Sequence, residues 1–194
     1  MDYSEKISEY LQKEINVLKM LDVKAIDAGM QLIRSAFDRE KNIYIFGNGG
    51  SAATASHYTN DFNKGISEYT EKKFRFICLN DNIATVMAIA NDIGYEEVFR
   101  FQLRGRLTKD DLVIAISGSG NSKNVINAVN YAKDIGCKVI GITGYNGGAL
   151  KPLSDVSMHV PVDNMQITED IHMVFDHLMM SLFYETLERK TGSE

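Results

Sequence analysis

The sequence has few of the residues that mark several common protein classes. Its 194 residues include 2 cysteines and 2 prolines, and no apolar run approaches the roughly 20 residues that span a bilayer. Cys78 and Cys137 are too few and too far apart for a disulfide scaffold or a thiolate zinc motif, so we expect buried thiols. The low proline content excludes collagen-like and proline-rich disordered chains. We therefore expect a globular protein that does not engage a membrane.

The chain also lacks a strong excess of charge of one sign. It carries 21 basic and 26 acidic side chains, a formal net charge of −5. Because the basic residues form no stripe, nucleic acid is not an expected partner. Residues 1–10 are polar and lack the basic start and apolar stretch of a secretory signal, so we expect a cytoplasmic protein.

Helical patterns at both ends of the chain flank five short apolar runs. The spacing of apolar residues predicts two helices within 1–40 and one long amphipathic helix over 166–191. The region 41–165 contains the runs 42–47, 74–79, 111–117, 138–143 and 156–162, which are typical of buried parallel strands. Strands that alternate with helices predict an α/β three-layer sandwich with a five-stranded parallel sheet and two additional N-terminal helices. We treat 1–194 as a single domain.

The terminal helices have wide apolar faces. The face of the C-terminal helix includes Ile171, Phe175, Leu178 and Leu182. Such faces either pack within one chain or contact another subunit, and both interpretations are open at this point.

Two strand–loop–helix units contain loops rich in glycine and serine, IYIFGNGGSAATASHYT and VIAISGSGNSKNVINAV. The start of a helix has unpaired N–H groups and partial positive charge, and the hydroxyls of Ser117, Ser119 and Ser122 can donate to phosphate oxygens. These loops predict a phosphate site, although serine and asparagine there could also simply cap the next helix. Neither loop has the GxGxxG or GK[ST] pattern, so no nucleotide cofactor is expected.

These loops and three further segments resemble the sugar isomerase (SIS) domain family, in particular its phosphoheptose isomerase branch. The segments are FGNGGSA, ISGSGNS, NDIGYEEVF at 91–99, TGYNGG at 143–148 and EDIHMVFDH at 169–177. The resemblance covers nearly the whole chain. It implies the SIS fold, a homotetramer with sites at subunit interfaces, and conversion of sedoheptulose 7-phosphate into D-glycero-D-manno-heptose 7-phosphate.

The resemblance also implies which residues bind the phosphorylated sugar. They are Asn48, Gly49, Gly50, Ser51, Asn91, Asp92, Ser117, Gly118, Ser119 and Ser122. The family usually has a threonine where this chain has Gly118, so one hydroxyl donor is missing here. Asn91 and Asp92 fit an ordinary helix end before Gly94 equally well.

Two histidines and two carboxylates carry the chemistry that the resemblance implies. Aldose–ketose isomerisation needs a base for a carbon-bound proton, a group that returns the proton, and an electrophile for the enediolate. His57 and Asp61 lie on one face of a helix, and Glu169 and His177 lie two turns apart on another. His177 is the expected acid/base partner, and either Asp61 or Glu169 is the expected base.

At these four positions the family has histidine, glutamate, glutamine and histidine, and some members bind zinc through them. The resemblance thus implies a divalent ion in each subunit, held by His57, Asp61, Glu169 and His177. Asp61 is one methylene shorter than the family's glutamate, and Glu169 adds a negative charge. Both departures leave the identity of the base open.

The other histidines are expected to be structural. His159 lies inside a predicted strand, where a hydrogen-bonded imidazole is the usual finding. His172 lies about 180° from His177 around its helix, because five residues subtend roughly 500°. The two are therefore not expected in one site.

Two other functions are compatible with the sequence. The departures at Asp61 and Glu169 fit a SIS isomerase for another sugar phosphate. A non-catalytic SIS tetramer, similar to the initiator-associating protein, would bind a protein partner such as a bacterial replication initiator and would need no acid/base set.

Overall fold

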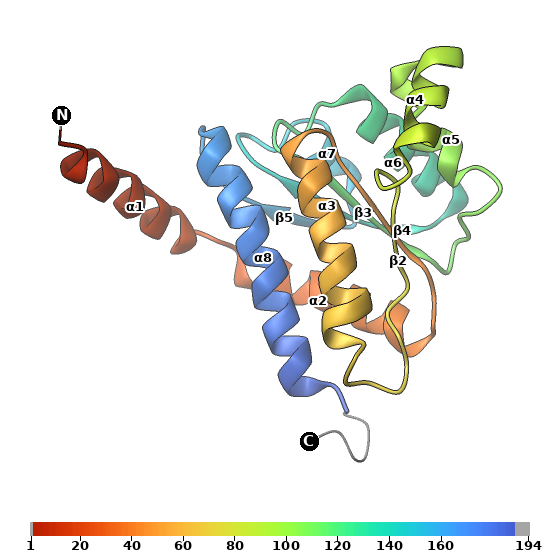
Figure 1. The fold of residues 1–194 in the computed structure, drawn as a ribbon, viewed down its shortest axis with the longest axis horizontal. Helices are drawn as coiled ribbons and strands as arrows, with labels where there is room; N and C mark the ends of the chain where they lie inside the picture. Colours follow the sequence, from red (N-terminus) through yellow and green to blue (C-terminus); the bar gives the residue numbers. More distant parts are fainter. Residues whose placement is uncertain (1, 189–194) are drawn as a thin grey trace.

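The computed structural model describes residues 2–188 and has a five-stranded parallel sheet between two layers of helices (Figure 1). The strands are β1 (Ile43–Phe46), β2 (Phe76–Cys78), β3 (Leu112–Ser117), β4 (Lys138–Thr143) and β5 (Val156–His159). Their order in the sheet is β2-β1-β3-β4-β5, and the neighbouring pairs are parallel. The predicted three-layer α/β fold is confirmed, with β3 in the centre.

The strands are apolar on both faces because each face packs against a separate core. In β1, Ile43 and Ile45 belong to one core, and Tyr44 and Phe46 belong to the other. The same alternation continues along β3, which is buried at every position. Since neither face can be left in water, helices must cover both.

The helices divide between these two faces. The first core includes residues of α2 (Val23–Asp38), α3 (Gly50–Asn60) and α8 (Met165–Thr186), and the second includes residues of α4 (Ile83–Asp92), α5 (Arg100–Leu103) and α6 (Lys123–Ile135). Two short helices, η2 (Tyr95–Glu97) and α7 (Leu150–Leu153), complete this second side. Among the described residues, no helix has the length and apolar character that a membrane crossing requires.

The long C-terminal helix is confirmed, but it is shorter than predicted. α8 ends at Thr186, and Leu187 after it has an extended backbone. The predicted end at 191 lies outside the described residues. α8 runs beside α3 in the same direction (Figure 1), and α3 continues directly into a π-helix, η1 (Asp61–Ile66).

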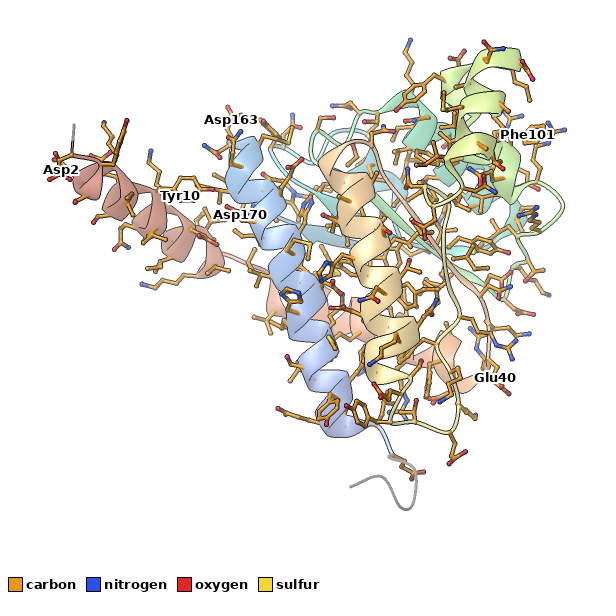
Figure 2. All side chains as sticks on the ribbon, viewed as in Figure 1. Asp2, Tyr10, Glu40, Phe101, Asp163 and Asp170 are labelled. Carbon is orange, nitrogen blue, oxygen red and sulfur yellow. The ribbon has the colours of Figure 1, made fainter. Side chains whose placement is uncertain are left out.

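The first helix, α1 (Ser4–Leu18), extends away from the body of the molecule (Figure 1). Its apolar stripe is exposed at Ile7, Leu11, Ile15 and Leu18. Figure 2 shows one polar link to the rest of the chain, where the Tyr10 hydroxyl donates a hydrogen bond to Asp170 of α8. The two N-terminal helices thus differ, because α2 packs on the sheet, while no other part of the described chain covers the apolar stripe of α1.

Both cysteines are buried and free, as expected. Burial raises the pKa of each thiol to about 12. Burial thus disfavours the thiolate, which is the form that binds metals and takes part in redox chemistry.

Candidate active site and metal centre

The first glycine-rich loop joins β1 to α3 and leaves the start of that helix without a capping side chain. A Cβ at Gly47 would lie 2.6 Å from the Ser51 Cβ and 2.8 Å from the carbonyl oxygen of Ile116, so only glycine fits there. The N-cap residue of α3 is Gly49, which makes no side-chain bond to the first N–H groups. This helix start is therefore suited to an anion.

The second loop joins β3 to α6, and its serines do not act as helix caps. Ser122 is the N-cap residue of α6 but makes no capping hydrogen bond, and its Oγ lies 3.2 Å from the Oγ of Ser117. The Ser119 Oγ accepts a hydrogen bond of 3.2 Å from the Asn121 backbone N–H. The hydroxyls of Ser117 and Ser122 can thus donate to a bound anion, which favours the phosphate interpretation of this loop over the capping one.

A pair of amides holds the two loops together. Asn48 donates to the Asn124 side-chain oxygen at 2.9 Å, and Asn124 donates back to the Asn48 oxygen at 2.8 Å. The Tyr95 hydroxyl donates to the same Asn48 oxygen at 2.8 Å. Asn48 therefore positions the loops, through Asn124 and Tyr95, two residues that sequence reasoning missed because the three lie far apart along the chain.

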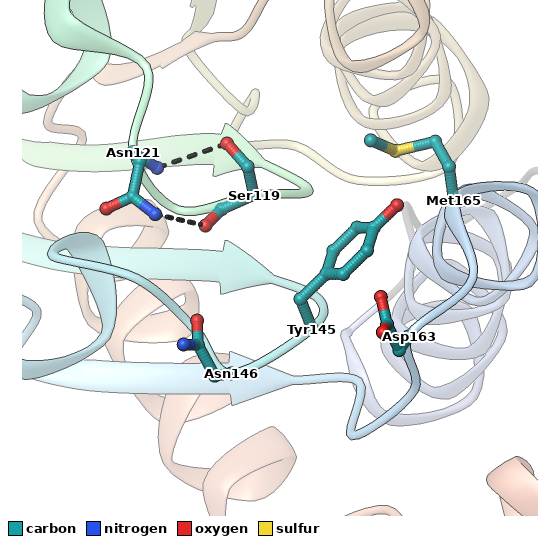
Figure 3. Close-up of a pocket in the computed structure, with 6 residues that line it drawn as sticks. All are labelled: Ser119, Asn121, Tyr145, Asn146, Asp163 and Met165. Carbon is teal, nitrogen blue, oxygen red and sulfur yellow. Dashed lines mark hydrogen bonds between the residues drawn. The ribbon is translucent and has the colours of Figure 1, made fainter.

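A pocket of about 610 Å³ opens beside the second loop (Figure 3). It is lined by Ser119, Asn121, Tyr145, Asn146, Asp163 and Met165. These residues come from the loops that follow β3, β4 and β5 and from the start of α8, at the carboxyl ends of the strands, where open α/β sheets bind ligands. Tyr145, from the TGYNGG segment, directs its ring toward Met165 (Figure 3).

Met165 also accounts for the glycine at position 118. A Cβ on Gly118 would lie 2.9 Å from the Met165 Sδ, so a threonine there would require this flexible side chain to move.

Asn91 and Asp92 lie away from this pocket within one chain. They form the end of α4, which packs on the opposite face of the sheet from α3 and α8. The Asn91 amide donates to the Asp92 carboxylate at 2.7 Å. Their place at a helix end agrees with the structural alternative.

Four side chains from α3, η1 and α8 converge about two turns below the first loop. The His57 Nε2 lies 3.4 Å from Asp61 Oδ2 and 3.2 Å from His177 Nε2, and the His177 Nε2 lies 3.8 Å from Asp61 Oδ2. The fourth member is Asp176, whose Oδ2 lies 3.9 Å from the His57 Nε2. One ligand atom from each of the four residues lies within 4.8 Å of the others.

Asp176 is the member of this group that sequence reasoning missed. Its side chain is 0% exposed, and neither carboxylate oxygen has a hydrogen-bond partner among the described residues. Burial, followed by the charge of Asp61, raises the pKa of Asp176 to about 8. Its position in the sequence could have revealed it. Asp176 falls in the buried stripe of α8 with His172 and Met179, where an apolar residue is expected, so an acidic residue there is unusual.

Glu169 does not join this group. Its carboxylate packs on Gly50, since a Cβ there would lie 2.5 Å from the Glu169 Oε1. Gly50 precedes His57 by seven residues, as Glu169 precedes Asp176, so the backbone of Glu169 lies roughly 10 Å before that of Asp176 along the parallel helices. Of the four predicted metal ligands, the structure brings together His57, Asp61 and His177, with Asp176 beside them.

The other two histidines lie outside this group, and His172 does not share a site with His177. The His159 Nδ1 lies 3.0 Å from the Thr143 hydroxyl. His172 is buried and neither ring nitrogen has a hydrogen-bond partner in the described chain. Burial lowers the pKa of His172 to about 4, partly offset by the Thr143 backbone.

The donor set of the cluster suits a divalent metal ion. Imidazole nitrogen and carboxylate oxygen bind zinc at about 2.0–2.2 Å, which separates ligand atoms in a tetrahedral site by roughly 3.4 Å. The distances of 3.2 and 3.4 Å from His57 to His177 and Asp61 match this separation, and those of 3.8 Å from His177 to Asp61 and 3.9 Å from His57 to Asp176 are somewhat longer. The two carboxylates, one of them without a partner, supply the charge that such an ion needs.

Comparison with known proteins agrees with these features. The sequence model of the SIS domain family matches residues 2–144. A phosphoheptose isomerase from Helicobacter pylori is 37% identical over 171 residues, which are 88% of this chain and 86% of that protein. The structures of phosphoheptose isomerases from Neisseria gonorrhoeae and Francisella tularensis have TM-scores of 0.86 and 0.87 at 26% and 27% identity, and each match covers 96% of this chain and 100% of that one. The chain therefore belongs to the phosphoheptose isomerase family of SIS domain proteins.

Proposed function

We propose that this protein is an aldose–ketose isomerase that converts sedoheptulose 7-phosphate into D-glycero-D-manno-heptose 7-phosphate. One observation carries the proposal: α3 begins at an uncapped glycine-rich loop and, two turns later, presents His57, which lies beside Asp61 at the start of η1 and His177 of α8. A single helix thus links a place for phosphate to a group of acids and bases. The names of the relatives point to the same reaction.

The reaction moves one hydrogen between adjacent carbons. A carboxylate base removes a proton from C1 of the ketose, and the electrons form the enediolate double bond between C1 and C2. The proton returns from the base to C2. The former carbonyl oxygen on C2 gains a proton and becomes a hydroxyl, and the C1 hydroxyl gives up its proton as C1 becomes the aldehyde, so the protons balance. Asp61 or Glu169 acts as the base, and His177 exchanges protons with the oxygens.

The loops hold the other end of the sugar. Ser51, Ser117, Ser119 and Ser122, with the N-termini of α3 and α6, bind the phosphate. A divalent ion such as zinc, held by His57, Asp61 and His177, would supply positive charge for the oxygens of the enediolate. Fixing the phosphate orients the reacting carbons, which accounts for a large part of catalysis in such reactions.

We also propose a homotetramer in the cytoplasm. The exposed stripe of α1, with Leu11 and Ile15 more than two-fifths exposed, is the kind of surface that a second subunit covers. Subunit contact would also bring Asn91 and Asp92 toward a site that they do not reach within one chain.

The test is the interconversion of sedoheptulose 7-phosphate by the purified protein, measured after chelation and again after zinc is restored. Asp61→Glu and Glu169→Gln each install the residue that the resemblance implies, and their rates identify the base. Loss of activity in Glu169→Gln alone assigns the base to Glu169, whereas retained activity assigns it to Asp61. No turnover by the wild-type protein in either metal state would refute the proposal.

A different sugar phosphate is the second candidate. It is favoured by the departures at Asp61 and Glu169, and by Gly118, where a hydroxyl donor is missing from the second loop. A panel of phosphosugars separates the two, since activity toward a hexose phosphate and none toward the heptulose would replace the substrate. If His177→Ala left the cellular function intact while a surface substitution abolished it, a non-catalytic role with a protein partner would take the place of both.

A further inference from the structure

Among the described residues near the site, Asp176 is a buried acidic side chain that lacks hydrogen-bond partners. Its carboxylate is fully buried, and both oxygens lack a hydrogen-bond partner. Buried carboxylates in native proteins are normally paired, hydrogen-bonded or bound to a metal, because an isolated buried charge is strongly unfavourable. An oxygen left without a partner on the wall of a ligand cluster therefore points to something that binds there.

The surroundings of Asp176 specify a cation. Asp61 and Asp176 offer oxygens within 4.8 Å of each other, and the imidazoles of His57 and His177 complete the group. Two carboxylates at this distance repel unless a proton or a cation lies between them. When both carboxylates are ionised they carry a charge of −2, which a divalent ion would balance.

The position of Glu169 argues against it as the fourth ligand. Its carboxylate lies against Gly50, at the level of the first loop, whereas the backbone of Asp176 lies roughly 10 Å further along the parallel helices. A glutamate side chain that reached down to the cluster would have to leave this contact, while Asp176 is already in place.

We propose that Asp176 completes the metal site of this protein together with His57, Asp61 and His177, and that Glu169 remains free beside the phosphate loops. The resemblance implies an amide side chain at position 169, so this chain has exchanged an amide ligand for a carboxylate located elsewhere on α8. This division of roles rests on the proposed metal site, but not on the identity of the sugar.

The experiment is metal binding to the purified oligomer, measured by competition with a chromophoric chelator. The matched pair is Asp176→Asn and Glu169→Gln, each a replacement of a carboxylate by the amide of the same shape. We expect Asp176→Asn to weaken zinc binding by tenfold or more, on the scale of losses seen when a metal site is disturbed. The zinc dissociation constant of Glu169→Gln should stay within about threefold of the wild-type constant.

Two further measurements keep the test decisive. In the cobalt-loaded protein, Asp176→Asn should change the visible d–d absorption, and Glu169→Gln should leave it unchanged. In chelated protein, Asp176→Asn should melt at the same temperature as the wild type or higher, because a buried carboxylate without a partner has been removed. The increase in melting temperature on adding zinc should shrink in that variant.

The opposite pattern would overturn the inference. If Asp176→Asn folds and binds zinc as the wild type does while Glu169→Gln loses affinity, Glu169 is the ligand, from the same subunit or from another. The outcome is separable from the proposed reaction. If zinc binding depends on Asp176 but the protein has no isomerase activity, the inference holds and the proposed function fails. If the wild-type protein is active but does not bind zinc, the proposed function holds and the inference fails.

Discussion

The two parts of the candidate site differ in how their polar groups are satisfied. In the loops, polar groups pair with each other, as in the reciprocal bonds of Asn48 and Asn124 and the bond from the Gly120 N–H to the Ser117 carbonyl oxygen. In the cluster, the His57 and His177 nitrogens face each other, and Asp176 has no hydrogen-bond partner within residues 2–188. The loops are thus preformed by the chain itself, while the cluster needs a proton or a cation from outside. This difference predicts that changes in the loops affect binding and folding, and that changes in the cluster affect chemistry.

The sharpest test of the contrast is His177→Ala. The side chain is 59% exposed, so its removal should change the melting temperature little. Loss of a general acid/base typically lowers kcat by a factor of 10²–10⁴. Steady-state kinetics on the proposed substrate measure this drop, and Ser181→Ala, one turn further along α8, is the control that should keep its activity. A large fall in melting temperature without a specific loss of kcat would mean that His177 is structural.

The loops should respond to a glycine substitution through folding. Gly120 has a φ of +66°, and a Cβ there would lie 2.0 Å from the backbone oxygen of Gly147. Gly105 has a φ of +73° with nothing near its Cβ position, so it isolates the backbone strain alone. We expect Gly105→Ala to cost about 1 kcal/mol and Gly120→Ala about 3 kcal/mol or more, by denaturant unfolding. If both substitutions lower the free energy of unfolding equally, the second loop adapts to the added Cβ and is not preformed.

A second buried group on α8 provides a comparison with Asp176. The pKa of His172 is lowered to about 4 by burial, so the unfolded chain takes up a proton at higher pH than the folded one. This contribution to stability is fully present above pH 6.5 and is lost as pH falls toward 4, by a total on the order of 2–3 kcal/mol. His172→Leu should flatten that part of the stability profile relative to the wild type. An unchanged slope between pH 6.5 and 4 would mean that His172 is hydrated or paired in solution.

The parts of the molecule that sequence predicts well are those fixed by local rules. The strands follow from continuous apolar runs, and the loops from glycines and serines at strand ends, so β3 and Ser122 lie where expected. The role of Asp176 depends on which face of α8 is buried. The link from Asn48 to Tyr95 depends on contacts between distant segments. Such features arise only when the layers pack.

The grouping of Glu169 with His177 shows the limit of spacing as a guide. The two residues lie two turns apart on one helix. The sequence alone does not determine which turn of α3 packs beside Glu169 and which packs beside His177. The parallel packing of α3 and α8 decides this, since it sets Glu169 beside Gly50 and His177 beside His57. A helix pair packed in the opposite direction would have exchanged these partners.

The smallest expected effect tests the loop hydroxyls as phosphate donors. The Ser122 hydroxyl lies 3.2 Å from Ser117 and caps no helix, so its removal should leave folding unchanged. A hydrogen bond to a charged group contributes about 1.5 kcal/mol or more, so Ser122→Ala should raise KM roughly tenfold with a smaller change in kcat. The inhibition constant of inorganic phosphate, a competitive inhibitor, should rise by a similar factor in this variant. Ser35→Ala, on the exposed side of α2, should change neither KM nor this inhibition constant. A fall in kcat at constant KM would instead place Ser122 with the reacting carbons, and the division between a binding region and a chemical region would no longer hold.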